Sequence, residues 1–141
     1  MPLVLNRSQA SLDRQNVNAQ AGLRDLINAE RDRRIAAGFA FEGHSYQFRD
    51  QDKARVTGAG ALAGFAIAGG AQAGDYLWHG GAEPFTWIAA DNAVVQLDAR
   101  QMFAMASAGA AHESAHVFAA KALKDADPIP SNYADDVHWP V

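Results

Sequence analysis

Residues 85–101 read FTWIAADNAVVQLDARQ. This stretch decides the fold because it joins two patterns of different period. Its first part holds two apolar runs, residues 85–89 and 94–97, on either side of the turn-forming residues 90–92. Such a pattern predicts a β-hairpin. The second part carries the signals that start a helix.

The helix start lies at Asp98. An aspartate suits the N-cap position, and Gln101 stands where a capping box needs its reciprocal partner. Leu97 and Met102 flank the cap and can form the apolar contact that often accompanies it. An alanine-rich apolar pattern then continues to about Asp125. We therefore expect a long helix directly after the hairpin.

The residues further upstream have the same order of a helix and a hairpin. Apolar residues recur at helical spacing from about Ala19, and Gly38 is typical of a helix C-terminus. Residues 39–48 then alternate around Glu42 and Gly43, a plausible two-residue turn. These patterns predict a first helix and a first hairpin.

A second helix is expected between the two hairpins. Asp50 and Asp52 are its N-cap candidates, and Gly69 and Gly70 should end it. The predicted order is helix, hairpin, helix, hairpin, helix. Local hairpins covered by helices predict an α+β fold with three helices and a small antiparallel sheet.

The chain divides into three expected parts. Residues 1–20 are a polar N-terminal arm, which is either flexible or ordered by another chain. Residues 21–126 form the α+β domain. Residues 127–141 contain prolines and acidic residues, and we expect this C-terminal tail to pack on the domain.

Composition excludes several classes of function. The net charge is −4, and residues 56–141 hold three basic and nine acidic side chains, so an interface with nucleic acid is not expected. The absence of cysteine excludes disulfides and thiolate zinc sites. The uncharged run 56–74 consists mainly of alanine and glycine, which is too weakly apolar to predict a membrane span.

One motif points to an enzyme. His112, Glu113 and His116 form H-E-x-x-H, which on a helix presents two imidazoles and a general base for a zinc hydrolase. A catalytic zinc needs a third protein ligand. Positions 119 and 122, where one zinc-peptidase family has glycine and histidine, are both alanine, and no glutamate follows Glu113. We therefore expect no catalytic residue, no cofactor and no metal, and a zinc hydrolase is kept as an alternative.

Two segments carry a family resemblance. The first is GFAFEGHSYQF at 38–48, and the second runs from FTWIAADNAVVQLDA at 85–99 into the helix with His112 and His116. From about Glu30 to the C-terminus the chain resembles a small uncharacterised family of tailed phages and prophages. That family occurs in or beside tail-fibre genes, and its members are described as tail or tail-fibre assembly proteins.

The resemblance implies a place of action rather than a reaction. The expected function is a non-enzymatic tail component of the virion, assembled in the host cytoplasm, that contacts other tail or tail-fibre proteins. Two further alternatives are an assembly chaperone that is absent from the virion and a receptor- or glycan-binding tip built on loop 76–88.

Self-association is also expected, with the threefold or sixfold symmetry common in tail parts. Apolar residues of the arm and first helix and exposed aromatics are the expected contacts. The interface candidates are Leu3, Val4, Leu5, Leu23, Ile27, Trp78 and Trp139. Trp87 is expected in the core.

Overall fold

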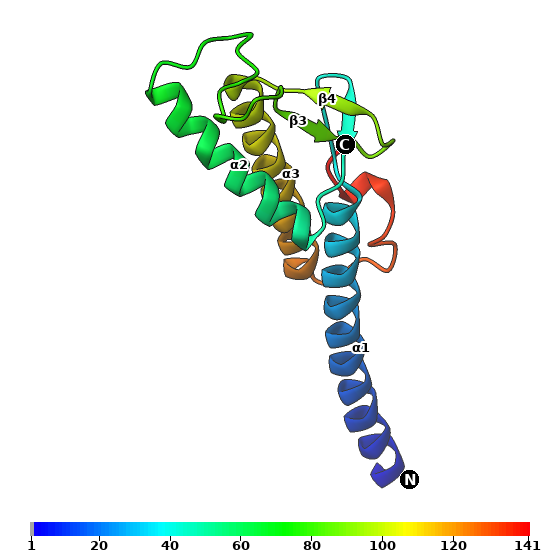
Figure 1. The fold of residues 1–141 in the computed structure, drawn as a ribbon. Coiled ribbons are helices and arrows are strands. Elements are labelled where there is room, and N and C mark those ends of the chain that lie inside the picture. The colour runs from blue at the N-terminus through cyan, green and yellow to red at the C-terminus, as the bar shows by residue number, and fades with distance from the viewer. Residues whose placement is uncertain (1) are drawn as a thin grey trace. The chain divides into compact units, whose positions relative to one another are not determined.

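The computed structural model describes the backbone of residues 2–141 and the side chains of residues 8–141. In this part of the chain the α+β order of helix, hairpin, helix, hairpin, helix is confirmed (Figure 1). The elements are α1 (Pro2–Ala37), β1 (Phe39–Phe41), β2 (His44–Tyr46), α2 (Asp50–Ala68), β3 (Thr86–Ile88), β4 (Val94–Gln96), α3 (Ala99–Asp125) and a short 3-10 helix, η1 (Asp136–His138).

Each hairpin forms its own two-stranded antiparallel sheet. In the first, Phe39 pairs with Tyr46 across the predicted turn, where Glu42 and Gly43 both have positive φ. Two consecutive positive φ values are typical of the tight turns that suit the twist of a hairpin. A backbone hydrogen bond of 2.7 Å from Ala90 N–H to the Ser45 carbonyl joins the second hairpin's turn to β2.

The start of α3 agrees with the sequence in atomic detail. The Gln101 N–H donates to Asp98 Oδ1 at 2.8 Å, and the Asp98 N–H donates to Gln101 Oε1 at 2.9 Å. Leu97 and Met102, the flanking apolar pair, are both buried. The predicted capping box is therefore confirmed, and it fixes the angle at which the second hairpin enters the helix.

The start of α2 differs from the prediction by one residue or more. Its N-cap is Arg49, and neither Asp50 nor Asp52 occupies that position. Asp52 lies three residues into the helix, where its carboxylate accepts a 3.0 Å hydrogen bond from the Arg49 N–H. An acid at this place satisfies the N–H of the N-cap residue itself, whereas an acid at the N-cap would accept from the second or third residue of the helix. The predicted end is confirmed, since the Gly70 N–H donates to the Ile67 carbonyl.

Helix α1 begins at Pro2, so the prediction of a start near Ala19 was wrong. Residues 6–20 contain no glycine or proline and are rich in alanine, glutamine, arginine and asparagine. The first three of these have good helix propensity. The segment lacks an apolar stripe against its own chain, and that stripe is the signal from which a helix is read.

The chain consists of two compact units. The terminal unit comprises the residues up to Asp32 and those from His116 onward, and the central unit is Arg33–Ala115. The core of the terminal unit contains Ile27, Ala120, Leu123, Ile129 and Trp139. The larger core of the central unit contains Ile35, Phe39, Tyr46, Phe48, Val56, Ala63, Ala89, Leu97, Ala99, Met102 and Met105.

Among the described helices, none is both long and apolar enough to cross a membrane.

Candidate functional site

The first histidine of the H-E-x-x-H motif is held by the backbone of α1. His112 Nε2 lies 3.1 Å from the carbonyl oxygen of Ile35. A carbonyl oxygen can only accept, so Nε2 carries the hydrogen and donates. The ring also packs near Phe39 and Phe48, with centroid separations of 5.8 and 6.2 Å. In this arrangement Nε2 has no lone pair to offer a metal ion.

The other two motif residues also have partners within the chain. Glu113 Oε1 accepts a 3.3 Å hydrogen bond from Lys53 Nζ, which makes a partly exposed ion pair. His116 is buried, and its ring stacks on Trp139 with centroids 6.2 Å apart and planes 21° apart. The described residues contain no group of three or more His, Cys, Asp or Glu side chains that could hold a metal ion.

The expected interface residues fall into three groups. The side chains of Leu3, Val4 and Leu5 lie outside the described residues. Ile27 and Trp139 are 0% and 5% exposed in the terminal core, so they are not available at the surface of this fold. The Trp139 Nε1–H donates to the Tyr133 carbonyl at 2.7 Å, and Leu23 is partly buried against the same core.

Trp78 is half-buried at the edge of the central core. Its Nε1–H donates to the Leu97 carbonyl at 3.0 Å, and its ring lies 4.7 Å from that of Phe85. On its outer side it lines a hollow of about 310 Å³ with Leu62 and Phe65 of α2. Phe65 is 77% exposed, which is unusual for a large apolar side chain.

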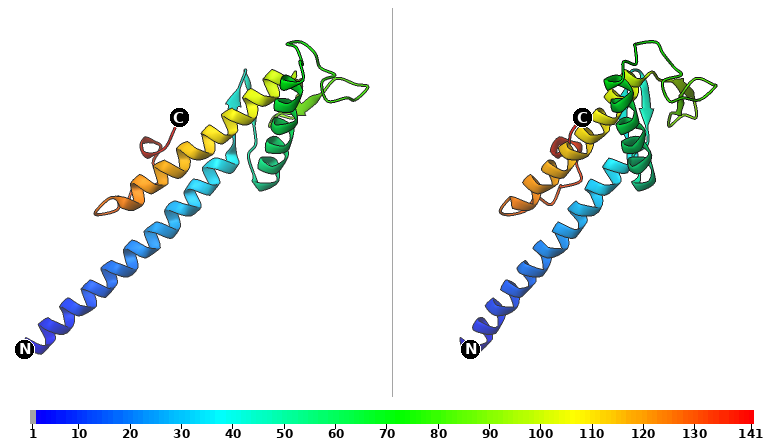
Figure 2. Two further views of the ribbon diagram at one scale, coloured as in Figure 1. Left: turned by 90° about the vertical axis from the view of Figure 1, so that its left-hand side faces the viewer. Right: turned by 60° about the vertical axis from the view of Figure 1, so that its left-hand side comes forward.

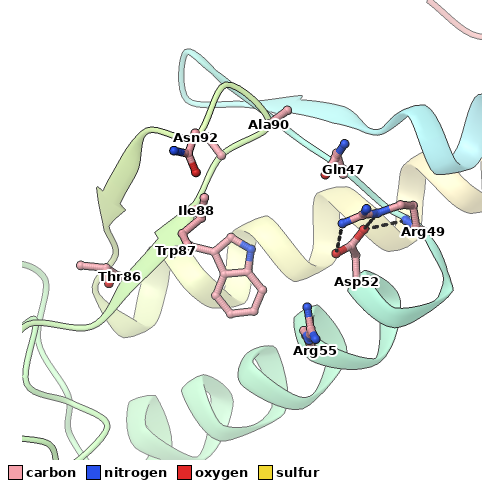
Figure 3. A pocket seen from close by; sticks show the side chains of 10 residues that line it. Gln47, Arg49, Asp52, Arg55, Thr86, Trp87, Ile88, Ala90 and Asn92 are labelled. Atoms are coloured by element: carbon pink, nitrogen blue, oxygen red, sulfur yellow. Dashed lines mark hydrogen bonds and ion pairs between the residues drawn. The ribbon is translucent and has the colours of Figure 1, made fainter.

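A second hollow in the central unit is larger and has charged and polar side chains in its lining. It has a volume of about 410 Å³ and lies between the start of α2, the segment before it, and the second hairpin (Figure 3). The side chains and backbone of three segments line it: Gln47, Arg49, Asp52, Arg55, Thr86, Trp87, Ile88, Ala89, Ala90 and Asn92. We call it the Trp87 pocket.

The lining of the Trp87 pocket contains two arginines and one aspartate. Arg49 Nε donates to Asp52 Oδ2 at 2.8 Å, and Arg49 Nη2 lies 3.3 Å from Asp52 Oδ1. The hydrogen bond from the Arg49 side chain holds the pKa of the Asp52 carboxyl below its ordinary value, although burial opposes this shift. Arg55 forms no hydrogen bond or ion pair with any residue whose side chain the structure describes. Its charge also lowers the pKa of the Asp52 carboxyl, so the two arginines share one aspartate and leave one net positive charge.

Trp87 is partly buried and packs against the central core, as the sequence suggested. Its ring packs against Phe85, and the two ring centroids are 6.1 Å apart. Its Nε1–H has no protein acceptor, and within the described part of the chain no buried side-chain nitrogen lacks a partner, so Nε1 is reached by solvent. Figure 3 shows this nitrogen on the side of the indole that faces Arg49 and Asp52. The sequence did not predict this site, because the site forms only where residues 47–55 lie beside residues 86–92.

The first half of α1 is a different kind of candidate surface. Gln9, Leu12, Asn16 and Ala19 lie along one side of the helix, because they follow one another at alternating steps of three and four residues. We call this line the α1 seam. The same side continues into Leu23, which packs on the terminal core. Figure 2 shows in both views that the first half of α1 extends without another segment of the terminal unit beside it.

Comparison with known proteins gives one match. The model of a family described as a domain of unknown function (DUF4376) matches residues 18–137, which is most of the chain. The searches of curated proteins and of solved structures gave no match.

Proposed function

The chain belongs to the DUF4376 family, and from this premise we propose that it is a non-enzymatic component of a phage tail. It associates with the fibre or the distal tail and acts through protein–protein contacts. The tail setting is supported by the resemblance of its two hairpins and following helix to the phage family described above. The proposal of a non-enzymatic role is supported by the internal partners of His112, Glu113 and His116.

One observation carries the proposal of a contact function. The α1 seam lies on a long helix, yet in the described part of the terminal unit the tertiary hydrogen bonds to α1 start only at Gln20, whose Oε1 accepts from the Ile129 N–H at 3.3 Å. Leu12 is 52% exposed. An isolated helix of this composition is marginal in water, and most helix stability in proteins comes from packing on a partner. The seam is thus a surface that binding would stabilise.

The spacing of the apolar residues in and beside the seam favours a second copy of the same chain as its binding partner. Leu5, Leu12, Ala19 and Leu26 occur at intervals of seven, and Leu26 is 51% exposed. A seven-residue repeat keeps one side of a helix against a partner helix that winds around it. A polar residue such as Asn16 at one position of such a repeat can fix the register of identical helices.

The charges beside the seam allow identical helices to approach. Between residues 8 and 20 the only charged residues are Asp13 and Arg14. Arg14 follows Leu12 by two positions and so lies on the far side of the helix. Asp13 accepts a 3.0 Å hydrogen bond from Gln9 Nε2. Copies joined along the seam therefore bring few like charges together.

The tail proposal is tested by quantitative mass spectrometry of purified phage particles that encode this chain. A structural component is present in a fixed number of copies per particle after washing in high salt. If the chain is abundant in the infected cell and missing from infectious particles, the structural proposal is wrong and the assembly chaperone takes its place.

A further inference from the structure

We propose that the Trp87 pocket binds an acidic sugar, that is, a pyranose ring bearing a carboxylate. This assignment does not depend on the proposed tail function, because it rests on the geometry of the central unit alone. The pocket of about 410 Å³ lies within the range of volumes that hold small ligands.

The walls of the pocket are fixed before any ligand arrives. The Ala90 N–H bond to the Ser45 carbonyl holds the turn of the second hairpin, and the Arg49–Asp52 pair holds the start of α2. Phe48, which lies between two lining residues in sequence, is 3% exposed and anchors that segment in the core. Binding therefore needs little ordering of the backbone, which favours affinity.

The charge of the pocket selects an anion. Arg49 is hydrogen-bonded to Asp52, and Arg55 attracts the same carboxylate without a hydrogen bond, so the two arginines and one aspartate give the lining one net positive charge. The central unit as a whole is acidic, with six basic and eight acidic side chains between residues 33 and 115. A positive site within an acidic unit is not a general feature of its surface. The planar guanidinium of Arg55 offers paired donors that match a carboxylate.

The remaining groups select a ring that carries hydroxyls. The Trp87 indole offers an apolar face on which the C–H groups of a pyranose can lie, and its free Nε1–H offers a donor. Gln47 and Asn92 each present both a donor and an acceptor, and Thr86 adds a hydroxyl. A sugar hydroxyl needs both kinds of partner, whereas a simple anion needs donors only. The combination of Arg55 with these groups is therefore specific to a ring that bears both a carboxylate and hydroxyls.

The three tryptophans provide an internal control for the test. Trp78 and Trp139 each donate their Nε1–H to a backbone carbonyl, so only Trp87 has an indole N–H that a ligand can reach. The three indole signals of the ¹⁵N-labelled full chain can be followed by NMR during titration. The Trp87→Phe variant assigns the signal of Trp87.

The probes are methyl glucuronoside and N-acetylneuraminic acid, with methyl glucoside as a neutral ring, and sodium acetate and sodium phosphate as anions without one. We expect an acidic sugar to shift the Trp87 signal saturably while the other two indole signals stay in place. Arg55→Gln should weaken binding about tenfold or more, because a hydrogen-bonded charge pair is lost. Arg100→Gln, an exposed arginine outside the pocket, should leave it unchanged.

Any one of the following results would overturn the assignment. The first is no shift of the Trp87 signal with either acidic sugar. The second is an equal response to acetate or phosphate, which would mean a plain anion site. The third is equal binding of methyl glucoside, or equal binding by Arg55→Gln in a chain whose spectrum shows that it is folded.

Discussion

His112 Nε2 donates a hydrogen bond to the Ile35 carbonyl and joins the middle of α3 to the end of α1, 77 residues earlier in the chain. The imidazole therefore stabilises the central unit at the place where a peptidase would hold zinc. We expect His112→Ala to lower the free energy of unfolding by about 2 kcal/mol, because the Ile35 carbonyl loses its partner and the aromatic contacts are lost. Denaturant unfolding measures this.

Glu113→Gln tests the alternative that the chain is a zinc hydrolase with Glu113 as its general base. The Glu113–Lys53 pair is partly exposed, with side chains 39% and 29% accessible, so its loss should change stability by less than about 0.5 kcal/mol. Added zinc should not change the melting temperature of the parent. A rise of several degrees with zinc that disappears in His112→Ala would instead support a metal site.

Gly38 occupies a position that other residues cannot take. Its φ is +104°, and a Cβ there would run into the carbonyl group of Tyr46. We expect Gly38→Ala to destabilise the chain by about 3 kcal/mol, because strain and a backbone clash act together. Gly22→Ala is the control, since a Cβ at that helical position meets nothing within 4 Å. It should stabilise by up to about 1 kcal/mol. Similar effects of the two variants in thermal unfolding would contradict this reading.

Asp98 holds two segments together. Besides capping α3 it accepts a 2.9 Å hydrogen bond from the Gly74 N–H, which ties the loop after α2 to the helix start. Asp98→Ala should cost about 2 kcal/mol, at the upper end for a lost N-cap. Asp98→Asn should recover part of this loss because asparagine is also a good cap. If alanine were as stable as asparagine in denaturant unfolding, the capping role would be refuted.

The Arg49–Asp52 pair makes stability depend on pH. The hydrogen bond from the Arg49 side chain lowers the pKa of Asp52 in the folded state below its ordinary 3.8. A lowered folded pKa contributes stability that is fully present above the ordinary pKa and is lost as the pH falls through the folded pKa. Asp52→Asn should therefore melt at a lower temperature than the parent near neutral pH, and the gap should narrow below about pH 4.

Asp50→Asn is the control for this prediction. The carboxylate of Asp50 is fully exposed and 3.7 Å from Lys53 Nζ, so screening by water leaves little to lose. Melting curves of the three proteins from about pH 7 to pH 2 test the prediction. A gap between the parent and Asp52→Asn that stays constant over this range would show that the ion pair is not its cause.

The sequence predicted those elements whose signals are local. The Glu42-Gly43 turn and the Asp98–Gln101 capping box each lie within a few residues, and both are present as expected. The tryptophan hairpin was predicted for the same reason, since its alternation and turn occupy a single stretch. Local signals of this kind do not need the tertiary fold to be known.

Features that depend on distant residues were not predicted. The Trp87 pocket needs the start of α2 beside the second hairpin, and no periodicity encodes that approach. Trp139 was an interface candidate as an aromatic residue, and the tail was also expected to pack through it; it is buried beside Ile129. The extension of α1 to Pro2 was missed because the seam has no partner among the described residues of the terminal unit, so its apolar residues are sparse.

The most direct test of a contact function is the mass of the full chain in solution, by sedimentation equilibrium. We predict a concentration-dependent multiple of 15.0 kDa for the parent. Leu12→Glu on the α1 seam should sediment as a monomer. Val17→Glu, an exposed residue on another side of α1, should keep the mass of the parent. A monomeric parent at every concentration, or the same mass for both variants, would contradict self-association through α1.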